Sequence, residues 1–554
     1  MKRSFLFGAF AFALAACTAP LTVTSAPTPA RPPASTAAAA PASVPRTTRD
    51  SAPTDWQLLD LAADHVPGIS VLRAEHDLLA GMTPRPVLVA VIDGGLDTAH
   101  VDLAPHLWHN PKEIAGNGKD DDGNGYVDDD WGWNFIGGAD GKDIDHETFE
   151  LTRLYSRCKG IANLSVAGPV PPAAECQHIE TEFEQKRLAD VATLDNIDNA
   201  DRALTRALEI LKAAIADSLT EARVKAFQPS GPNEVQARAI FLQLEDRGVT
   251  PSVIAEAKKE YTSRVKYGYD STYDPRPIVG DDYNNLSQRD YGNRDVMGPD
   301  ALHGSHVSGI IAGMPDAKEG IQGIAQAARI MMIRTIPDGD ERDKDVANAI
   351  RYAVDEGARV INMSFGKEYS PQKAVVDDAV RYADAHGVLM VHAAGNDGKD
   401  IDQGQNFPTP YYLTGGRAQN WIEVGASSWK GGDTLATSFS NYGQQRVDVF
   451  APGEDILSTI PGNKYERDSG TSMASPVVAG LAALIMSYYP SLSAADVKRI
   501  ILQSATRYPA QMVARPGAKD GDPLVPFGSL SVTGGIVNAY AALQLAASAA
   551  AAKP

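Results

Sequence analysis

The heptad Gly470-Thr471-Ser472-Met473-Ala474-Ser475-Pro476 precedes an almost wholly apolar run, residues 477–488, which ends before Pro490. Proline suits the first turn of a helix, where its missing N–H is not needed, so the run predicts a buried helix beginning close to Ser472. Helix N–H groups at that end favour developing negative charge. Ser472 therefore stands where a nucleophile would be well placed, although for Gly-Thr-Ser alone an ordinary serine N-cap is the simpler interpretation.

A second decisive stretch is Val87-Leu88-Val89-Ala90-Val91-Ile92, which is followed by Asp93-Gly94-Gly95-Leu96-Asp97. A continuous β-branched run is typical of a central parallel strand. A carboxylate at its C-terminal end lies where α/β sheets place active sites, although Asp-Gly alone more often marks a turn. Further strands over 328–336, 359–363 and 387–394 alternate with helical segments. The pattern predicts a doubly wound, mostly parallel sheet with helices on both faces.

Four segments together resemble the subtilisin-like serine proteases, the subtilases. In chain order they are Asp93-Gly94-Gly95, His303-Gly304-Ser305-His306, Ala393-Ala394-Gly395-Asn396 and the heptad around Ser472. The order Asp, His, Ser is that of subtilisin. Gly94 stands where the family usually has Thr or Ser, and Ser305 and Ser308 replace the usual Thr and Ala. The resemblance covers residues 87–142 and 270–540.

This resemblance implies a serine endopeptidase that acts on polypeptides. Its catalytic residues would be Asp93, His303 and Ser472, with the Asn396 side chain in the oxyanion hole and His306 in a supporting role. The implied substrate-binding residues are Ser364, Phe365, Gly366 and Gly395. The alternative is a catalytically silent binding lipoprotein with the same fold. Such proteins usually lose one of the four catalytic positions, all of which are present here.

An acidic loop, residues 117–130, lies between the Asp and His motifs. Oxygen side chains at alternate positions and Gly125 at the bend match the first half of an EF-hand-type calcium loop. Trp131 stands where the closing glutamate is expected, so a later aspartate must close the shell. We expect structural calcium, and a solvated acidic turn is the alternative. The predicted ligands are Asp120, Asp122, Asn124, Tyr126, Asp128 and Asp129.

The N-terminus predicts export. Lys2 and Arg3 precede an apolar run over 5–16 that reads as a secretory signal and is too short to span a membrane. It ends in Leu14-Ala15-Ala16-Cys17, which resembles the lipobox of bacterial lipoproteins and implies lipid on Cys17. Plain signal cleavage is the alternative. Because residue 18 is not aspartate, the expected location is the outer membrane, on the periplasmic or surface side, or release from it.

Composition sets the remaining expectations. The formal net charge is −19, and no Lys/Arg block stands out beyond the first three residues, so nucleic-acid binding is not expected. Residues 18–53 are rich in Pro, Ala and Thr and predict an extended tether. The peptidase domain is expected over 54–142 and 270–545, with an Ala-rich tail over 546–554. Residues 54–86 are too few for the inhibitory prodomain that subtilases often carry.

Residues 143–269 predict an α-helical insertion. Leu204, Leu208 and Leu211 recur at helical spacing, and Thr250-Pro251 is a typical helix start. The insertion separates Asp93 from His303, so one hypothesis is a lid that narrows the approach to Ser472; a lateral decoration is the alternative. Cys158 and Cys176 either pair in an oxidising compartment or remain free thiols.

Overall fold

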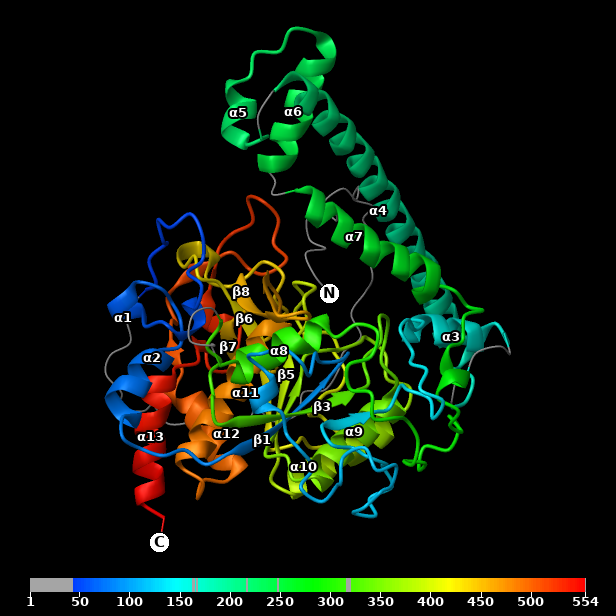
Figure 1. Ribbon diagram of the computed structural model, residues 1–554, viewed down its shortest axis with the longest axis vertical. Helices are drawn as coiled ribbons and strands as arrows, with labels where there is room; N and C mark the ends of the chain where they lie inside the picture. The colour runs from blue at the N-terminus through cyan, green and yellow to red at the C-terminus, as the bar shows by residue number, and fades with distance from the viewer. Residues whose placement is uncertain are drawn as a thin grey trace. The chain divides into compact units, whose positions relative to one another are not determined.

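Strand β1 (Val87–Asp93) lies inside a nine-stranded sheet on which the fold is built (Figure 1). The computed structural model describes residues 43–161, 165, 168–215, 218–246, 249–314 and 320–553. The other described strands are β2 (Gly132–Asn134), β3 (Ala328–Arg334), β4 (Val360–Met363), β5 (Leu389–Ala393), β6 (Trp421–Ser427), β7 (Val449–Pro452), β8 (Ile456–Ile460), β9 (Lys464–Asp468), β10 (Thr506–Arg507), β11 (Met512–Val513), β12 (Val525–Pro526) and β13 (Gly535–Ile536). The described α-helices are α1 (Leu61–Asp64), α2 (Val71–Ala74), α3 (Glu150–Cys158), α4 (Ala173–Ala214), α5 (Glu221–Ala226), α6 (Pro232–Asp246), α7 (Pro251–Ser263), α8 (Leu302–Ala312), α9 (Asp343–Asp355), α10 (Lys373–Ala385), α11 (Thr471–Tyr488), α12 (Ala494–Ser504) and α13 (Ala539–Ala551).

The strand order of the large sheet is β10-β13-β7-β6-β5-β4-β1-β3-β2. Neighbouring strands run parallel except β10 and β13, which are antiparallel. β1 is the point at which the order reverses, with β3 on one side and β4 on the other. In such sheets, sites form beyond the carboxyl ends of the strands at this switch point. The predicted fold class is confirmed, and Asp93, the last residue of β1, stands at that position.

The two faces of the sheet carry separate cores, and β1 shows why its sequence is apolar throughout. Val89 and Val91 pack with α8 and α11 on one face, whereas Ala90 and Ile92 pack with α9 and α10 on the other. Side chains alternate between the faces of a strand, so a strand covered on both sides needs apolar residues at every position. Among the described helices, only α11 is long and apolar enough to cross a membrane, and 94% of its apolar window is buried inside the protein.

The segment before β1 belongs to the same core. Trp56, Ile69 and Val71 are fully buried, and the Trp56 indole N–H donates to the Glu454 carbonyl oxygen at 3.0 Å. Val44, inside the predicted tether, is 1% exposed, and its N–H donates to Gln511 Oε1 at 2.9 Å. The last part of that predicted tether therefore lies against the fold; residues 18–42 lie outside the described residues.

The described chain divides into two compact units. Glu184–Lys266 forms one, and the rest of the described chain forms the other. The helical unit has its own apolar core, whose fully buried members are Ile197, Leu204, Ala207, Leu211, Val224, Ala237, Phe241, Val249, Ile254 and Ala257. The larger unit includes α3 and the start of α4, which a disulfide between Cys158 and Cys176 joins. Of the two alternatives for these cysteines, the structure has the paired one.

Candidate active site

Ser472 is the second residue of α11, follows the cap residue Gly470 closely, and is 6% exposed. The helix begins at Thr471, close to Ser472 as predicted, but Pro476 lies inside it and not in its first turn. Its missing N–H would otherwise bond to the carbonyl of Ser472, four residues before it. The Ser364 hydroxyl donates to that carbonyl instead, at 2.9 Å. The proline is thus tolerated. The hydrogen bond from Ser364 that replaces the missing one joins the Ser472 backbone to the segment that contains Ser364.

Asp93 and His303 form a hydrogen-bonded pair. His303 Nδ1 lies 2.8 Å from Asp93 Oδ1 and 2.9 Å from Oδ2. A carboxylate only accepts hydrogen bonds, so the pair places the proton on Nδ1 and leaves Nε2 with a lone pair. The Asp93 side chain is 3% exposed, and Oδ1 also accepts from the Gly94 N–H at 2.7 Å. The pair is therefore held in the geometry that a general base and its orienting acid require.

A close approach of two backbones brings His303 to Asp93. His303 is the second residue of α8, and the next residue, Gly304, packs directly on the turn after β1. A Cβ atom on Gly304 would lie 2.2 Å from the Gly95 carbonyl oxygen, so only glycine fits there. Further along the same helix, His306 Nε2 lies 3.1 Å from the Ile456 carbonyl and 3.0 Å from that of Glu466. His306 thus joins α8 to the β8–β9 hairpin.

The Asn396 amide is oriented by the residue before the serine. Its Oδ1 accepts from the Thr471 N–H at 2.8 Å and from the Thr471 hydroxyl at 2.9 Å. A backbone N–H can only donate, so the amide oxygen must face Thr471 and the NH₂ group must point elsewhere. The Thr471 hydroxyl in turn accepts from the Gly395 N–H at 3.1 Å. The Asn396 NH₂ group is therefore left as a donor at the start of α11.

The Ser472 hydroxyl itself donates to the Ser364 carbonyl oxygen at 3.1 Å. Within the described part of the chain no hydrogen bond joins this hydroxyl to His303, so the structure pairs Asp93 with His303 but leaves Ser472 in another rotamer. Hydrogen bonds between catalytic groups are often long or absent until substrate binds.

Of the predicted substrate-binding residues, Ser364 contacts Ser472 and Gly395 contacts Thr471. Phe365 is buried, and its carbonyl oxygen lies 2.9 Å from Nε2 of His392. Gly366 faces Asn406, whose Oδ1 is 2.3 Å from the position that a Cβ atom on Gly366 would take. Asn406 also donates to the carbonyl oxygen of Ala393 at 3.0 Å, so it joins the strand that leads to Gly395 to the segment at Gly366.

Several residues that the sequence did not single out complete the site. Asn362 donates to the Ser364 hydroxyl at 3.0 Å and accepts from Ser475 at 2.7 Å, which links β4 to the first turn of α11. Asn441 donates to the Ala394 carbonyl at 2.9 Å and accepts from the N–H groups of Asp397 and Lys399. Ser475 is 113 positions from Asn362, and Ala394 is 47 positions from Asn441, so no local pattern marked these roles.

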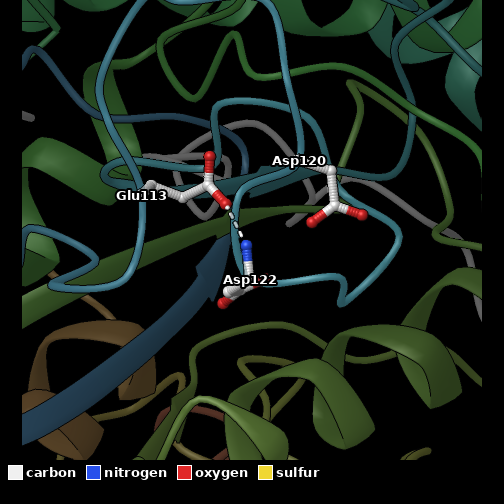
Figure 2. Close-up of side chains that lie close together, drawn as sticks. All are labelled: Glu113, Asp120 and Asp122. Carbon is white, nitrogen blue, oxygen red and sulfur yellow. Dashed lines mark hydrogen bonds between the residues drawn. The ribbon is translucent and has the colours of Figure 1, made fainter.

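The acidic loop gathers one residue that the prediction did not include. Glu113, Asp120 and Asp122 each offer a carboxylate oxygen, and these atoms lie within 4.8 Å of one another (Figure 2). Glu113 Oε1 accepts from the N–H groups of Asp121 and Asp122, the latter at 3.2 Å. Its other oxygen, Oε2, is buried with no hydrogen-bond partner among the described residues. An all-oxygen set with an unsatisfied carboxylate fits Ca²⁺.

The other predicted ligands have different partners. Asp128 accepts from the N–H groups of Asn117 and Gly118 at 3.0 and 2.9 Å. Asp129 is fully buried and bonds to Tyr352, and burial raises its pKa to about 6. The Tyr126 ring packs on aromatic neighbours in the core. Asn124 donates to Asp129 at 3.0 Å, so it bridges the loop to the core. Among the predicted carboxylates in the described chain, only Asp120 and Asp122 group with Glu113.

Comparisons with known proteins agree with this geometry. The model of the subtilase family, peptidase S8, matches residues 85–520, more than half of the chain. The thermophilic serine proteinase of Bacillus sp. (strain AK1) is 43% identical over 224 residues, 40% of this chain and 50% of that protein. The intracellular serine protease of Paenibacillus polymyxa is 34% identical over 46% of this chain and 72% of that protein. Halolysin of Haloferax mediterranei is 32% identical over 62% of each chain.

The matched region spans half the length of the Bacillus proteinase. Among solved structures, the protease domain of PatA, determined as a mutant, aligns with 45% of this chain and 82% of its own at 30% identity, with a TM-score of 0.35. The family match contains the Asp93–His303 pair, the Asn396 turn and the Ser472 helix described above. The chain belongs to the subtilase family.

Proposed function

We propose that the protein is a serine endopeptidase in which Ser472 is the nucleophile and His303 is the base. His303 Nε2 takes the proton from the Ser472 hydroxyl as it attacks the scissile carbonyl, and later gives that proton to the leaving amine. Asp93 fixes the His303 tautomer and stabilises the imidazolium. The Ser472 N–H and the Asn396 NH₂ group donate to the oxyanion of the tetrahedral intermediate.

The observation that carries this proposal is the Asp93–His303 pair at the switch point of the sheet, on the sheet whose core also contains α8 and α11. The test is hydrolysis of a peptide library by the purified full-length chain, with the cleaved bonds identified by mass spectrometry. Cleavage that a serine-reactive phosphonate stops supports the endopeptidase. A folded chain that binds peptides and cleaves none would support the silent binding lipoprotein instead.

We infer that calcium stabilises the acidic loop, with Glu113, Asp120 and Asp122 as its protein ligands. Two observations support this: the three carboxylates converge, and the buried Glu113 Oε2 has no partner among the described residues. The Lys112 ammonium lies 3.6 Å from Asp122 Oδ2 and is itself largely exposed, so it offsets only part of the negative charge. Bound Ca²⁺ would neutralise the carboxylates and fix the loop between β1 and β2.

Removal of calcium should lower the melting temperature of the protein. A ligand present at about a hundred times its dissociation constant stabilises the folded state by about 2.7 kcal/mol, which for a protein of this size raises the Tm by about 3 °C. Differential scanning calorimetry with and without a chelator measures this shift. Asp122→Ala should abolish most of it, whereas Asp121→Ala, which removes a carboxylate outside the three, should leave it in place. Equal melting curves with and without the chelator would contradict the calcium site.

The proposed location is the cell envelope, with a lipid anchor on Cys17. The support is the sequence Leu14-Ala15-Ala16-Cys17 at the end of the signal, which lies outside the described residues. One acyl chain alone gives only marginal, reversible binding to a membrane, so stable attachment through Cys17 would need more than one acyl chain.

Cys17→Ser should move the protein from the membrane fraction to the soluble fraction of cells. Without lipid, the acidic and polar body of the protein has little affinity for a bilayer. Immunoblots of fractionated cells test this, with Ser472→Ala as a matched control that keeps the anchor and should remain in the membrane fraction. If Cys17→Ser and the control distribute alike, the lipobox prediction is wrong.

A further inference from the structure

The chain directly after the proposed substrate-binding residues rests on a helical stem. We define the stem as α3 (Glu150–Cys158) together with residues 173–183 of α4, which the Cys158–Cys176 disulfide joins. Both parts belong to the larger unit, the one that contains the candidate active site. Two side chains that follow Gly366, those of Lys367 and Tyr369, contact the stem.

The contact that Lys367 makes with the stem is stronger than that of Tyr369, because the Lys367 charge is buried. Its ammonium lies 2.8 Å from Glu150 Oε2 on the stem and 2.9 Å from Asp343 Oδ1 at the start of α9. It also donates to the Glu341 carbonyl oxygen at 2.8 Å, and the side chain is 2% exposed. Burial alone would raise the pKa of Glu150, but the cations Arg153 and Lys367 hold this pKa down to about 2. A buried charge with these partners keeps one position, because any displacement leaves it unpaired.

The Lys367 backbone is held from its other side. Its N–H donates to the Phe407 carbonyl at 3.0 Å, and the Phe407 N–H donates back to the Lys367 carbonyl at 2.8 Å. Phe407 follows Asn406, the residue that faces Gly366. The segment that ends at Gly366 is therefore fixed at its C-terminal end by a main-chain pair and by a buried ion pair.

Tyr369 continues the same contact. Its hydroxyl donates to Glu182 of the stem, and its ring packs against the apolar cluster that contains Leu154, Ile179 and Phe183. Between these two residues, Glu368 pairs with Lys399 at 2.7 Å, just beyond the Asn396 turn. The loop after Gly366 thus contacts the stem on one side and, through Glu368, the segment just after Asn396 on the other.

We propose that Lys367 is a positioning residue for substrate binding, held in place by the carboxylate that the stem contributes through Glu150. This inference rests on the proposed function; the substrate-binding residues that the resemblance implies, Ser364–Gly366, would pair with the backbone of an extended peptide. Such pairing needs main-chain groups fixed in advance, and they are fixed by the side chains packed behind them. The stem is then part of the machinery that binds the substrate.

The test compares two buried lysines, each of which pairs with a buried carboxylate. Lys367→Met removes the charge that faces the stem. Lys344→Met is the matched control, because Lys344 is equally buried and, within the described chain, its ammonium pairs with Asp281 and donates to the Asp282 carbonyl, away from Ser364–Gly366. Steady-state kinetics use a peptide that extends several residues before the scissile bond, at a temperature where circular dichroism shows each variant folded. Labelling of Ser472 by a small phosphonate probe reports the reactivity of the serine separately.

Lys367→Met should raise the KM of the extended peptide by about tenfold to a hundredfold, the cost of misplaced binding groups, while probe labelling stays within about threefold of wild type. Lys344→Met should leave both quantities near the wild-type values. Glu150→Gln, which keeps the size of the side chain and removes the stem carboxylate, should raise KM in the same direction and serves if Lys367→Met does not fold.

Three results would overturn the inference. Equal KM values for wild type, Lys367→Met and Glu150→Gln would show that the stem does not position the segment. Equal changes in Lys367→Met and Lys344→Met would show a general loss of stability instead. A wild-type protein that neither cleaves peptides nor labels at Ser472 would overturn the proposed function, and the inference with it.

Discussion

Ser472→Ala is expected to lower turnover of peptide substrates by about 10⁶-fold, the loss seen when the nucleophile of a subtilisin-type triad is removed. The substitution takes away the only atom of this residue that can form the acyl bond. The remaining donors, the residue 472 N–H and the Asn396 NH₂ group, can still stabilise an oxyanion, so a small rate above that of water should persist. The measurement is kcat for an internally quenched peptide under saturating substrate.

The fold should survive this change. The Ser472 hydroxyl makes one hydrogen bond, to the Ser364 carbonyl, whereas the tie between the two segments at the Ser472 carbonyl remains. Circular dichroism and melting curves of Ser472→Ala should therefore match those of wild type within a few degrees. Turnover at the wild-type rate in a folded Ser472→Ala protein would show that another residue is the nucleophile.

Asp93→Asn is expected to lower kcat by about 10⁴-fold with the fold intact. An amide at this position no longer requires a proton on His303 Nδ1, and it can donate to that nitrogen through its own NH₂ group. The imidazole then takes the wrong tautomer, with the proton on Nε2, where the base must be free. The same change also removes the negative charge that stabilises the imidazolium.

Asp97→Asn is the matched control for Asp93→Asn. Its carboxylate belongs to the same motif and is buried, but it accepts from the N–H groups of Ala99 and Gly462 and does not contact His303. Asp97→Asn should keep kcat within about tenfold of wild type, because the substitution changes only these local hydrogen bonds. If Asp93→Asn lost no more activity than Asp97→Asn, the role of Asp93 in orienting His303 would be wrong.

Much of the fold could be predicted from the sequence because the signals were local. The run before Asp93 is apolar at every position, which only a strand buried on both faces requires, and the structure places it between two cores. The place of Pro476 inside α11 could not be predicted in this way. Proline at position 476 favours a helix start there, but the Ser364 hydroxyl satisfies the carbonyl that the proline leaves unpaired. That partner is 108 residues away in the chain.

The candidate metal ligands show the same limit. Spacing within the loop identified Asp120 and Asp122, yet the third carboxylate of the group comes from Glu113, outside the expected motif. Asp129 was predicted as a later aspartate that could close the shell, but the structure buries its side chain against Tyr352. The spacing of residues within a loop predicts which side chains share one face of it. It does not predict how the loop folds against the preceding chain, which contains Glu113.

The predicted helical insertion, residues 143–269, differs most from the structure, in which the separate unit is Glu184–Lys266. Helical periodicity marked it as a separate element, and Glu184–Lys266 is a unit with its own core. The stem that precedes this unit is instead part of the larger unit, because Glu150 pairs with Lys367 across 217 residues. Charged residues at such separations carry no sequence pattern that predicts their pairing.

The most direct test of the account is the site at which a fluorophosphonate probe labels the full-length protein. The probe forms a covalent bond only with an activated serine, so peptide mass spectrometry should find the adduct on Ser472 in wild type and little or none in His303→Ala. That result would show both the nucleophile and its dependence on the base. A folded protein with an unmodified Ser472, or with equal labelling in His303→Ala, would contradict the proposed serine endopeptidase.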